Sequence, residues 1–277
     1  MKVGVVGTGT MGSGIAQTFA AANGYSVLIC SRSVESANNT KAKITKSLEG
    51  LVTKGKISRE DADATLACIS TGTKPDLADC DLIVEAAVED MQLKRELFES
   101  LQGICKKTAI FATNTSSLSI TGLSAGLDRP VIGMHFFNPV PIMKLVEIVT
   151  GLGTPQDLVE KVREIAVSVG KTPVIAKDDA GFIVNRLLIP MINEAIGVFA
   201  DGTASEKDID TAMKLGANHP MGPLELGDLI GLDVCLAIME VLHSQTGDQK
   251  YRPHQLLRKM VQAKTLGRKT GKGFYQY

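Results

Sequence analysis

The chain has 277 residues, of which 44% are hydrophobic and 22% charged, a composition that allows a large core and excludes disordered and collagen-like proteins. Thirty basic residues balance thirty acidic ones, so the overall charge favours neither nucleic acid nor an anionic membrane as a partner. No apolar run approaches the ~20 residues that span a bilayer. The opening "MKVGVVGTGTMG" lacks a charged start, an apolar run and a cleavage site, so we expect a soluble chain without a targeting segment.

The cysteines indicate a reducing compartment. Cys30, Cys68, Cys80, Cys105 and Cys235 are odd in number, form no CxxC pair and stand mostly beside apolar residues. Reduced core cysteines show this pattern. We therefore expect a cytoplasmic protein.

The first part of the chain has the pattern of an α/β fold. From residue 1 to about 180, short runs rich in Val and Ile alternate with longer amphipathic stretches, as in βα units. This predicts an N-terminal Rossmann-type domain with a doubly wound, mostly parallel sheet. We expect strands at 2–6, 26–30, 82–85, 109–112, 131–134, 145–149 and 173–175.

After Gly181 the periodicity becomes helical and no alternating strands remain. Pro190 falls inside the first of these helices, where we expect it to kink the axis. The sequence therefore predicts a dinucleotide-binding domain over 1–180, a boundary near 178–183 and an all-helical domain over 181–277.

A glycine motif, Gly7-x-Gly9-x-x-Gly12, follows the first strand and opens a helix. Gly7 permits the tight turn, Gly9 lets the backbone approach a pyrophosphate, and Gly12 allows close packing of helix on strand. The helix N-terminus offers free N–H groups to the anion. Glycines also serve ordinary turns, but the strand and helix around the motif favour dinucleotide binding, with Thr10 and Met11 part of the site.

The residue about 20 positions further on, at the end of the second strand, selects between NAD and NADP. Here it is Ser31, followed by Arg32. An acid would hydrogen-bond the ribose 2′-OH of NAD and repel a 2′-phosphate, whereas Arg32 supplies a planar fork of donors suited to phosphate. An arginine at this place can also be merely solvated. We favour NADP(H) as the cofactor, with NAD(H) as the alternative.

His135 and Glu147 form a candidate acid–base pair. His135 follows the apolar run 131–134, and Glu147 lies twelve residues on, in another apolar run. A carboxylate that holds a histidine fixes its tautomer and stabilises the imidazolium. The alternative is a hydrogen-bonded core histidine beside an edge-strand charge. The neighbouring "HFFNP" and "NTSS" segments favour the catalytic interpretation.

Polar side chains also follow the expected strand 109–112. Asn114, Ser116 and Ser117 can donate to a carbonyl oxygen or accept from a nicotinamide. They are equally suited to capping the next helix. Both roles can coexist.

The sequence gives little support for a metal site or a separate carboxylate site. His219, His243 and His254 lack HExxH or Cys–His spacing, so we expect no metal site. Glu225 and Asp228 in "NHPMGPLELGD" could indicate a carboxylate site. We interpret this segment as a loop and helix cap that supports domain packing or dimer contacts.

A family resemblance rests on seven segments: "GTGTMGSGIAQTFA", "CDLIVEAAVEDMQLK", "NTSSLSI", "GMHFFNPVPIMKLVEIV", "GFIVNRLLIPMINEA", "GANHPMGPLELGDLIGLD" and "GRKTGKGFYQY". Their combination is far more specific than a shared Rossmann fold. Over essentially its whole length the chain resembles the short-chain L-3-hydroxyacyl-CoA dehydrogenases, and most closely the bacterial 3-hydroxybutyryl-CoA dehydrogenases.

The resemblance implies that (S)-3-hydroxybutanoyl-CoA and acetoacetyl-CoA are interconverted by a homodimer that joins through its helical domain. It makes His135 the general base in oxidation and the acid in reduction, oriented by Glu147. Ser116 matches a hydroxyl near the substrate oxygen and the nicotinamide, and Asn185 an amide that positions the substrate carbonyl. Because Asn185 begins the helical domain, the resemblance implies an active site between the domains.

The resemblance also marks cofactor-contacting positions at Glu89, Lys94, Asn138 and Lys269. From residue type alone, Glu89, Lys94 and Lys269 would be solvated surface charges.

Residues 38–66, between the second and third expected strands, match the helical arm of the family. Ser47 and Lys54 fall on its CoA-contacting positions, and further lysines add positive charge that suits the phosphates of an acyl-CoA: Lys41, Lys43, Lys46 and Lys56. An exposed charged helix is the alternative interpretation.

Two features depart from the family. The loop "SAGLDRPVIG" is about two residues shorter than usual, and "CSRS" has Ser31 where the family usually has an aspartate. The second departure favours NADP over NAD.

Two other functions remain as alternatives. A dehydrogenase of free 3-hydroxyacids would use a catalytic lysine and would leave the basic arm unexplained. A non-catalytic dinucleotide-binding structural or sensor protein would not need His135, Glu147, Ser116 and Asn185 together.

Overall fold

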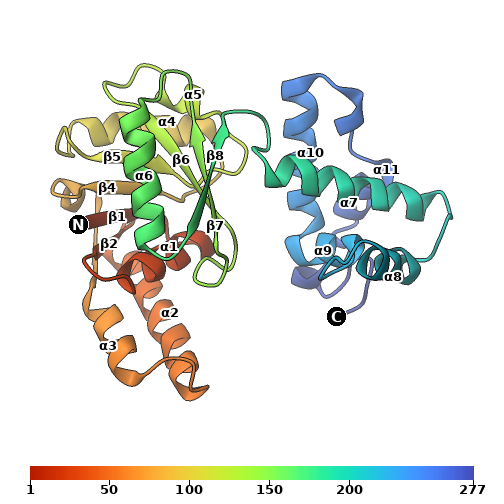
Figure 1. The fold of residues 1–277 in the computed structure, drawn as a ribbon, viewed down its shortest axis with the longest axis horizontal. Helices are drawn as coiled ribbons and strands as arrows, with labels where there is room; N and C mark the ends of the chain where they lie inside the picture. Colours follow the sequence, from red (N-terminus) through yellow and green to blue (C-terminus); the bar gives the residue numbers. More distant parts are fainter. The chain divides into compact units, whose positions relative to one another are not determined.

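The computed structural model describes residues 1–277 and divides them into two compact units, Met1–Asp179 and Ala180–Tyr277. The first contains a sheet with helices on both faces, and the second is entirely helical (Figure 1). The predicted α/β class, with a helical C-terminal part, is confirmed.

The sheet of the first unit has eight strands in the order β3-β2-β1-β4-β5-β6-β7-β8. All neighbouring strands are parallel except the antiparallel pair β6 and β7. Because the chain runs outward from β1 through β2 to β3 and then returns to β4, the order reverses beside β1 and leaves a crevice at the carboxyl ends of the strands. The strands are β1 (Lys2–Val6), β2 (Ser26–Cys30), β3 (Ile69–Gly72), β4 (Leu82–Glu85), β5 (Ile110–Thr113), β6 (Val131–Phe136), β7 (Leu145–Thr150) and β8 (Thr172–Lys177).

One strand, β3, is missing from the sequence-based prediction. Its sequence, Ile-Ser-Thr-Gly, has a single strongly apolar side chain and no alternating pattern. It lies at the edge of the sheet and pairs only with β2. An edge strand needs little apolar surface of its own, so the hydrophobic pattern did not reveal it.

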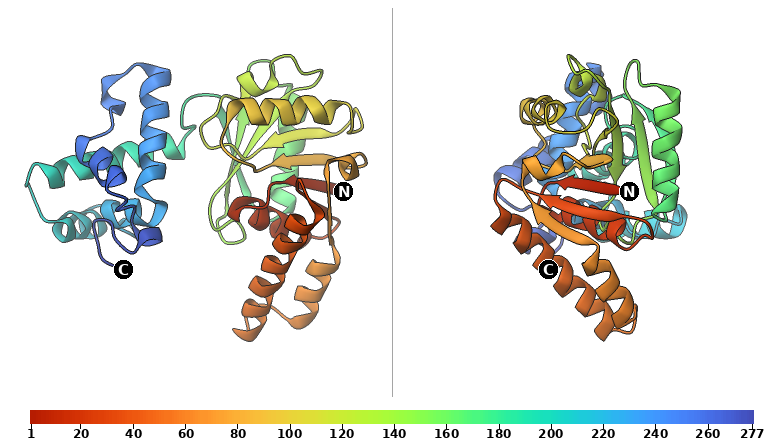
Figure 2. Two further views of the ribbon diagram at one scale, coloured as in Figure 1. Left: turned by 180° about the vertical axis from the view of Figure 1, so that it is seen from behind. Right: turned by 90° about the vertical axis from the view of Figure 1, so that its left-hand side faces the viewer.

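Alternate side chains of the strands build two apolar layers. On β2, Val27 and Ile29 belong to the layer under α1 (Thr10–Ala20) and α6 (Gln156–Ser168), whereas Leu28 and Cys30 belong to the layer under α4 (Met91–Gln102). Figures 1 and 2 show α6 and α4 on opposite faces of the sheet. The first layer contains α1 (Thr10–Ala20), α2 (Val34–Thr53), α3 (Arg59–Ala67) and α6 (Gln156–Ser168), and the second contains η1 (Lys74–Leu77), α4 (Met91–Gln102) and α5 (Ile120–Ser124).

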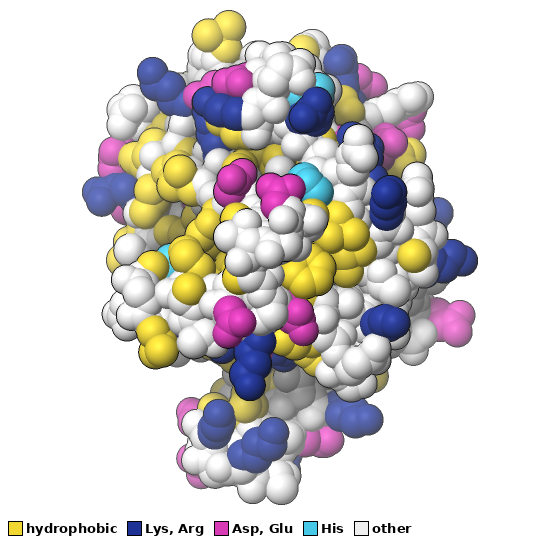
Figure 3. All heavy atoms as spheres, turned by 90° about the vertical axis from the view of Figure 1, so that its right-hand side faces the viewer, with side chains coloured by type: hydrophobic (Ala, Val, Ile, Leu, Met, Phe, Trp, Pro, Cys, Tyr) yellow, Lys and Arg dark blue, Asp and Glu magenta, His cyan; other side chains and the backbone are white.

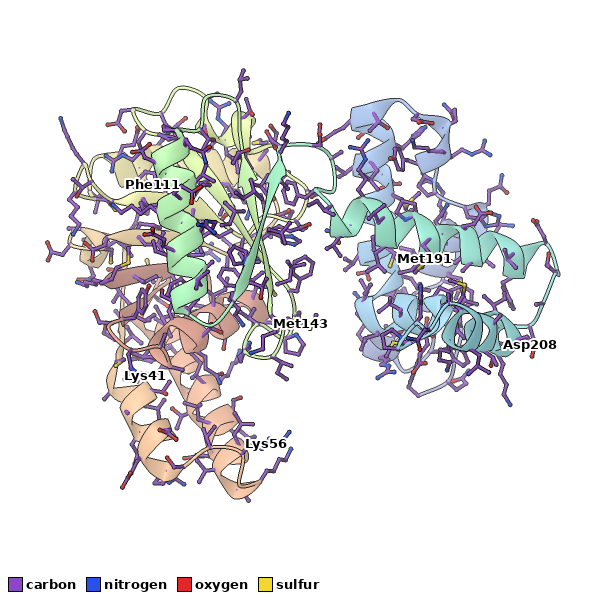
Figure 4. The ribbon with its side chains drawn as sticks, viewed as in Figure 1. Lys41, Lys56, Phe111, Met143, Met191 and Asp208 are labelled. Atoms are coloured by element: carbon purple, nitrogen blue, oxygen red, sulfur yellow. The ribbon has the colours of Figure 1, made fainter.

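The expected arm over 38–66 is a pair of helices, α2 and α3, and starts earlier than predicted. Ser33 caps α2 by accepting the N–H of Ser36, and Ser58 begins α3 with a capping box. The Lys41 ammonium donates to the carbonyl of Ile69 at 2.6 Å and joins α2 to β3. Lys56 lies at the far end of the pair (Figure 4).

The helical unit contains α7 (Val184–Ala200), α8 (Glu206–Gly216), α9 (Pro223–Ile230), α10 (Leu232–Thr246), η2 (Gln249–Tyr251), α11 (Gln255–Gln262) and η3 (Arg268–Thr270). Pro190 lies inside α7, as predicted. The segment "NHPMGPLELGD" is a loop as far as Gly222, the N-cap of α9, and its last residues, including Glu225 and Asp228, form the start of α9. Asp228 is buried and accepts the N–H groups of Phe274 and Tyr275, so it anchors the C-terminal segment on α9.

All five cysteines are free thiols, and all but Cys68 are buried. Burial raises the pKa of Cys30 and of Cys80 to about 11. These thiols therefore stay protonated near neutral pH and are poor nucleophiles. No helix in the structure combines the length and the apolar composition needed to cross a bilayer.

Candidate active site

A cavity of about 1140 Å³ lies in the first unit, at the carboxyl ends of β1, β2, β3 and β4. This edge of a doubly wound sheet, where the strand order reverses, is where such folds bind dinucleotides. The lining includes residues that follow each of the four strands: Gly7, Thr8 and Gly9; Ser31, Arg32, Ser33 and Ser36; Thr73 and Lys74; Ala86, Ala87 and Val88.

The glycine motif shapes this cavity for a pyrophosphate. Gly7 has φ +135°, and a Cβ there would lie 2.3 Å from the carbonyl oxygen of Ala86. A Cβ on Gly12 would lie 2.2 Å from the carbonyl oxygen of Gly7, whereas one on Gly9 would meet no atom within 4 Å. Gly9 is the N-cap of α1, and no side chain caps that helix. The open space and the N–H groups of the first turn therefore fit a dinucleotide phosphate.

Ser31 and Arg32 both line the cavity at the end of β2. The backbone N–H of Ser31 donates to the carbonyl of Gly72 at 3.2 Å. This bond keeps the end of β2 against the end of β3. The position that selects between NAD and NADP thus faces the cavity without a carboxylate of its own.

A buried ion pair joins the end of β4 to α4. The Lys94 ammonium lies 2.6 Å and 2.8 Å from the two carboxylate oxygens of Glu85, and the two side chains are 2% and 0% exposed. The Thr113 hydroxyl and the N–H of Ala87 also donate to Glu85, each at 2.6 Å. The expectation from residue type that Lys94 is a solvated surface charge is therefore wrong.

Lys94 also connects to Glu89, whose Oε2 lies 3.4 Å from the ammonium. The other oxygen of Glu89 accepts the Thr115 hydroxyl at 2.6 Å and the backbone N–H groups of Ser116 and Ser117 at 2.9 and 3.1 Å. Burial raises the pKa of Glu89, but the Lys94 ammonium and the hydrogen bonds from Thr115 and Ser116 outweigh it and hold that pKa below its usual range. An ionised Glu89 therefore fixes the loop that carries Ser116.

His135 and Glu147 are direct partners across the antiparallel pair β6 and β7. The Nδ1 of His135 lies 2.6 Å from the Oε2 of Glu147, and both side chains are buried. Two corrections follow. β6 runs through His135 to Phe136, so the histidine lies in the strand and does not follow it. Glu147 is not an edge-strand charge, because β7 lies between β6 and β8.

The polar residues after β5 do not cap the next helix. Ser119 caps α5 by accepting the N–H of Gly122 at 3.0 Å, so the expected capping role of Asn114, Ser116 and Ser117 is wrong. Asn114 instead accepts the N–H of Phe136 at 2.9 Å through its side-chain oxygen. It thereby ties the end of β5 to the strand that carries His135.

The remaining predicted site residues lie elsewhere on the chain. Asn138 is exposed and follows β6, while Ser47 on α2 and its C-cap Lys54 are exposed on the arm. Asn185, in the first turn of α7, and Lys269, in η3, belong to the helical unit. Lys269 forms an ion pair with Asp233.

Sequence reasoning missed two groups of the cavity region. Glu85 ends an otherwise apolar run, "LIVE", and a carboxylate at such a place must find a partner; this signal could have revealed the buried pair. Lys74 follows β3, and without that strand nothing placed it near Ser31.

The chain matches two family models, "3-hydroxyacyl-CoA dehydrogenase, NAD binding domain" over residues 2–179 and "3-hydroxyacyl-CoA dehydrogenase, C-terminal domain" over residues 181–277. The 3-hydroxybutyryl-CoA dehydrogenase of Clostridioides difficile is 55% identical over 100% of this chain and 99% of its own length. The human mitochondrial hydroxyacyl-coenzyme A dehydrogenase is 42% identical over 99% of this chain and 90% of its own length. The crystal structure of (S)-3-hydroxybutyryl-CoA dehydrogenase from Ralstonia eutropha superposes with a TM-score of 0.95 at 47% identity, covering 100% and 98% of the two chains.

The glycine motif yields a prediction with a built-in control. Gly12→Ala should destabilise the first unit by about 1–3 kcal/mol, because its Cβ meets the backbone of Gly7. Gly9→Ala should change the unfolding free energy by less than about 1 kcal/mol but weaken dinucleotide binding at least tenfold, since its methyl group occupies the phosphate space. Thermal unfolding and calorimetric titration would measure both effects. Normal cofactor affinity in Gly9→Ala would contradict the assignment.

The buried ion pair yields a second prediction. Lys94→Met leaves Glu85 charged and unpaired in the interior, so we expect a loss of about 3–5 kcal/mol in the unfolding free energy of the first unit. Arg258→Met removes an exposed partner of Glu240 and should cost at most about 1 kcal/mol. Urea unfolding followed by circular dichroism would compare the two. Adding Glu85→Gln to Lys94→Met should restore part of the lost unfolding free energy, because the double variant buries no unpaired charge.

Proposed function

We propose a reaction for this chain, which belongs to the 3-hydroxyacyl-CoA dehydrogenase family and is therefore an oxidoreductase with a nicotinamide dinucleotide cofactor. The proposed reaction interconverts (S)-3-hydroxybutanoyl-CoA and acetoacetyl-CoA. The substrate is supported by the names of relatives that are 55% and 47% identical over nearly their full lengths. The observation that carries the proposal is the buried pair of His135 and Glu147 on neighbouring strands.

The pair supplies the proton chemistry of the reaction. In oxidation, the His135 imidazole takes the proton of the 3-hydroxyl group while hydride leaves C3. The alcohol at C3 thereby becomes a ketone. In reduction, the imidazolium returns the proton to the ketone oxygen. The nicotinamide, when bound, accepts or supplies the hydride. Glu147 holds the ring through Nδ1 and stabilises its charged form.

Ser116 and Asn185 complete the proposed set of catalytic residues. We assign to Ser116 a hydrogen bond to the substrate oxygen near the nicotinamide, with its loop held by Glu89. Asn185 supplies the amide that positions the substrate carbonyl. Ser47 and Lys54, on the exposed side of the arm, contact CoA, and Lys43 and Lys46 add positive charge beside them.

The proposed cofactor is NADP(H). Ser31 and Arg32 line the cavity at the position that receives the ribose 2′ group. A guanidinium there attracts a 2′-phosphate, and no carboxylate at the end of β2 opposes it. Glu89, Lys94, Asn138 and Lys269 are further proposed contacts of the cofactor.

The proposal extends to assembly and location. We assign a homodimer that joins through the helical unit, because Leu187, Leu215 and Leu229 there are 71%, 84% and 48% exposed. On the face turned to the viewer in Figure 3, apolar side chains lie on both sides of a central white segment, with charged side chains above and below it. The free thiols support a reducing, cytoplasmic setting.

Activity itself is tested by acetoacetyl-CoA reduction, followed by the loss of NADPH absorbance, with free acetoacetate as the control substrate. His135→Gln should lower kcat by a factor on the order of 10² or more, the size expected for an acid–base residue. Glu147→Gln should lower kcat in the same direction, with the KM for NADPH little changed. Near-normal turnover of His135→Gln would remove this residue from the proposed role.

Cofactor preference gives a separate prediction. The wild-type protein should have a higher kcat/KM with NADPH than with NADH, because Arg32 pairs with the 2′-phosphate. The double variant Ser31→Asp, Arg32→Ile should reverse this order, because the new carboxylate repels the phosphate and accepts the 2′-OH. A double variant that still prefers NADPH would mean that other groups select the phosphate.

A further inference from the structure

A lysine without a role so far, Lys74, lines the cofactor cavity. It follows β3, the edge strand, in which Gly72 pairs with Cys30 of β2. Ser31 donates its N–H to the carbonyl of Gly72 at 3.2 Å. The segments that follow β2 and β3 therefore start side by side at the carboxyl edge of the sheet. Lys74 stands two residues beyond that bond, next to the position that receives the ribose 2′ group.

More cations than carboxylates line the cavity. Its cations are Arg32, Lys74 and Lys94, and its only carboxylate is Glu96. Lys94 is neutralised by the buried Glu85, so two cations of the lining, Arg32 and Lys74, remain against one carboxylate, Glu96.

The Lys74 ammonium is exposed and available to an anion. An ammonium has three N–H donors, and one of them is given to the Ser100 hydroxyl at 3.1 Å. The acid closest in sequence, Asp76, accepts the N–H of Thr73 at 2.8 Å and its hydroxyl at 3.2 Å through a single oxygen. Three residues with hydroxyl groups, Ser31, Ser33 and Thr73, also line the cavity.

We propose that Lys74 is a second cation for the 2′-phosphate of NADP(H) and, with Arg32, determines cofactor specificity. A phosphate monoester carries close to two negative charges at neutral pH, more than one guanidinium balances. NADH lacks this phosphate and gains nothing from Lys74, so the residue contributes to selectivity and not to binding in general. The inference rests on the proposed preference for NADP(H).

The test is a calorimetric titration of the full chain with two probes that differ only in the 2′ group, adenosine 2′,5′-bisphosphate and adenosine 5′-monophosphate. Lys74→Ala should weaken binding of the bisphosphate on the order of tenfold and leave the monophosphate unchanged. Lys74→Arg should keep most of the affinity. Lys107→Ala removes the same charge from an exposed lysine of this unit that does not line the cavity, and should change neither Kd.

The outcomes separate this inference from the cofactor proposal. If the wild-type protein binds both probes equally, the preference for NADP(H) is wrong and Lys74 has no phosphate to bind. If the wild-type protein prefers the bisphosphate and Lys74→Ala keeps the same preference, the inference alone fails and the preference stands. An equal loss for both probes would also overturn it, because Lys74 would then act on the part of the nucleotide that they share.

Discussion

The buried ion pair of Glu85 and Lys94 connects the sheet, α4 and the loop that carries Ser116. Removing two charges from water is costly and is tolerated only where geometry and additional hydrogen bonds compensate. Here both oxygens of Glu85 face the ammonium, and Thr113 and Ala87 donate to the same carboxylate. The pair therefore determines where α4 lies against the end of β4. Lys94 also contacts Glu89, and Glu89 accepts the backbone N–H of Ser116.

The contact of His135 with Glu147, the proposed acid–base pair, depends on a different constraint, the register of one antiparallel strand pair. Side chains opposite each other on antiparallel strands share a face, and His135 is opposite Glu147. A slip of one residue would turn Glu147 to the other face of the sheet. A parallel connection would also need a crossover of a dozen or more residues between the strands. The single antiparallel pair in the sheet is thus the element that brings two residues twelve positions apart into contact.

Most of the fold could be predicted from the sequence, because parallel strands buried on both faces read as apolar runs. The edge strand β3 could not, since its stability comes from pairing with β2 and not from apolar side chains of its own. The site divides in the same way. Glycine spacing and the residues after each strand indicated the cavity at the strand ends, and the residue types of His135 and Glu147 predicted their contact. The burial of Lys94 was missed because it depends on a partner, Glu85, from another element.

The missing strand also changes how cofactor selection is understood. A rule that considers only the end of β2 treats Ser31 and Arg32 as sufficient. In the structure, the carboxyl ends of β2 and β3 share a backbone hydrogen bond, so the residues after β3 line the same part of the cavity. Two adjacent charges that neutralise one dianion hold it more strongly than either charge alone. Under the proposal made above, cofactor choice in this chain is a property of two neighbouring strand ends, and sequence spacing from the glycine motif locates only one of them.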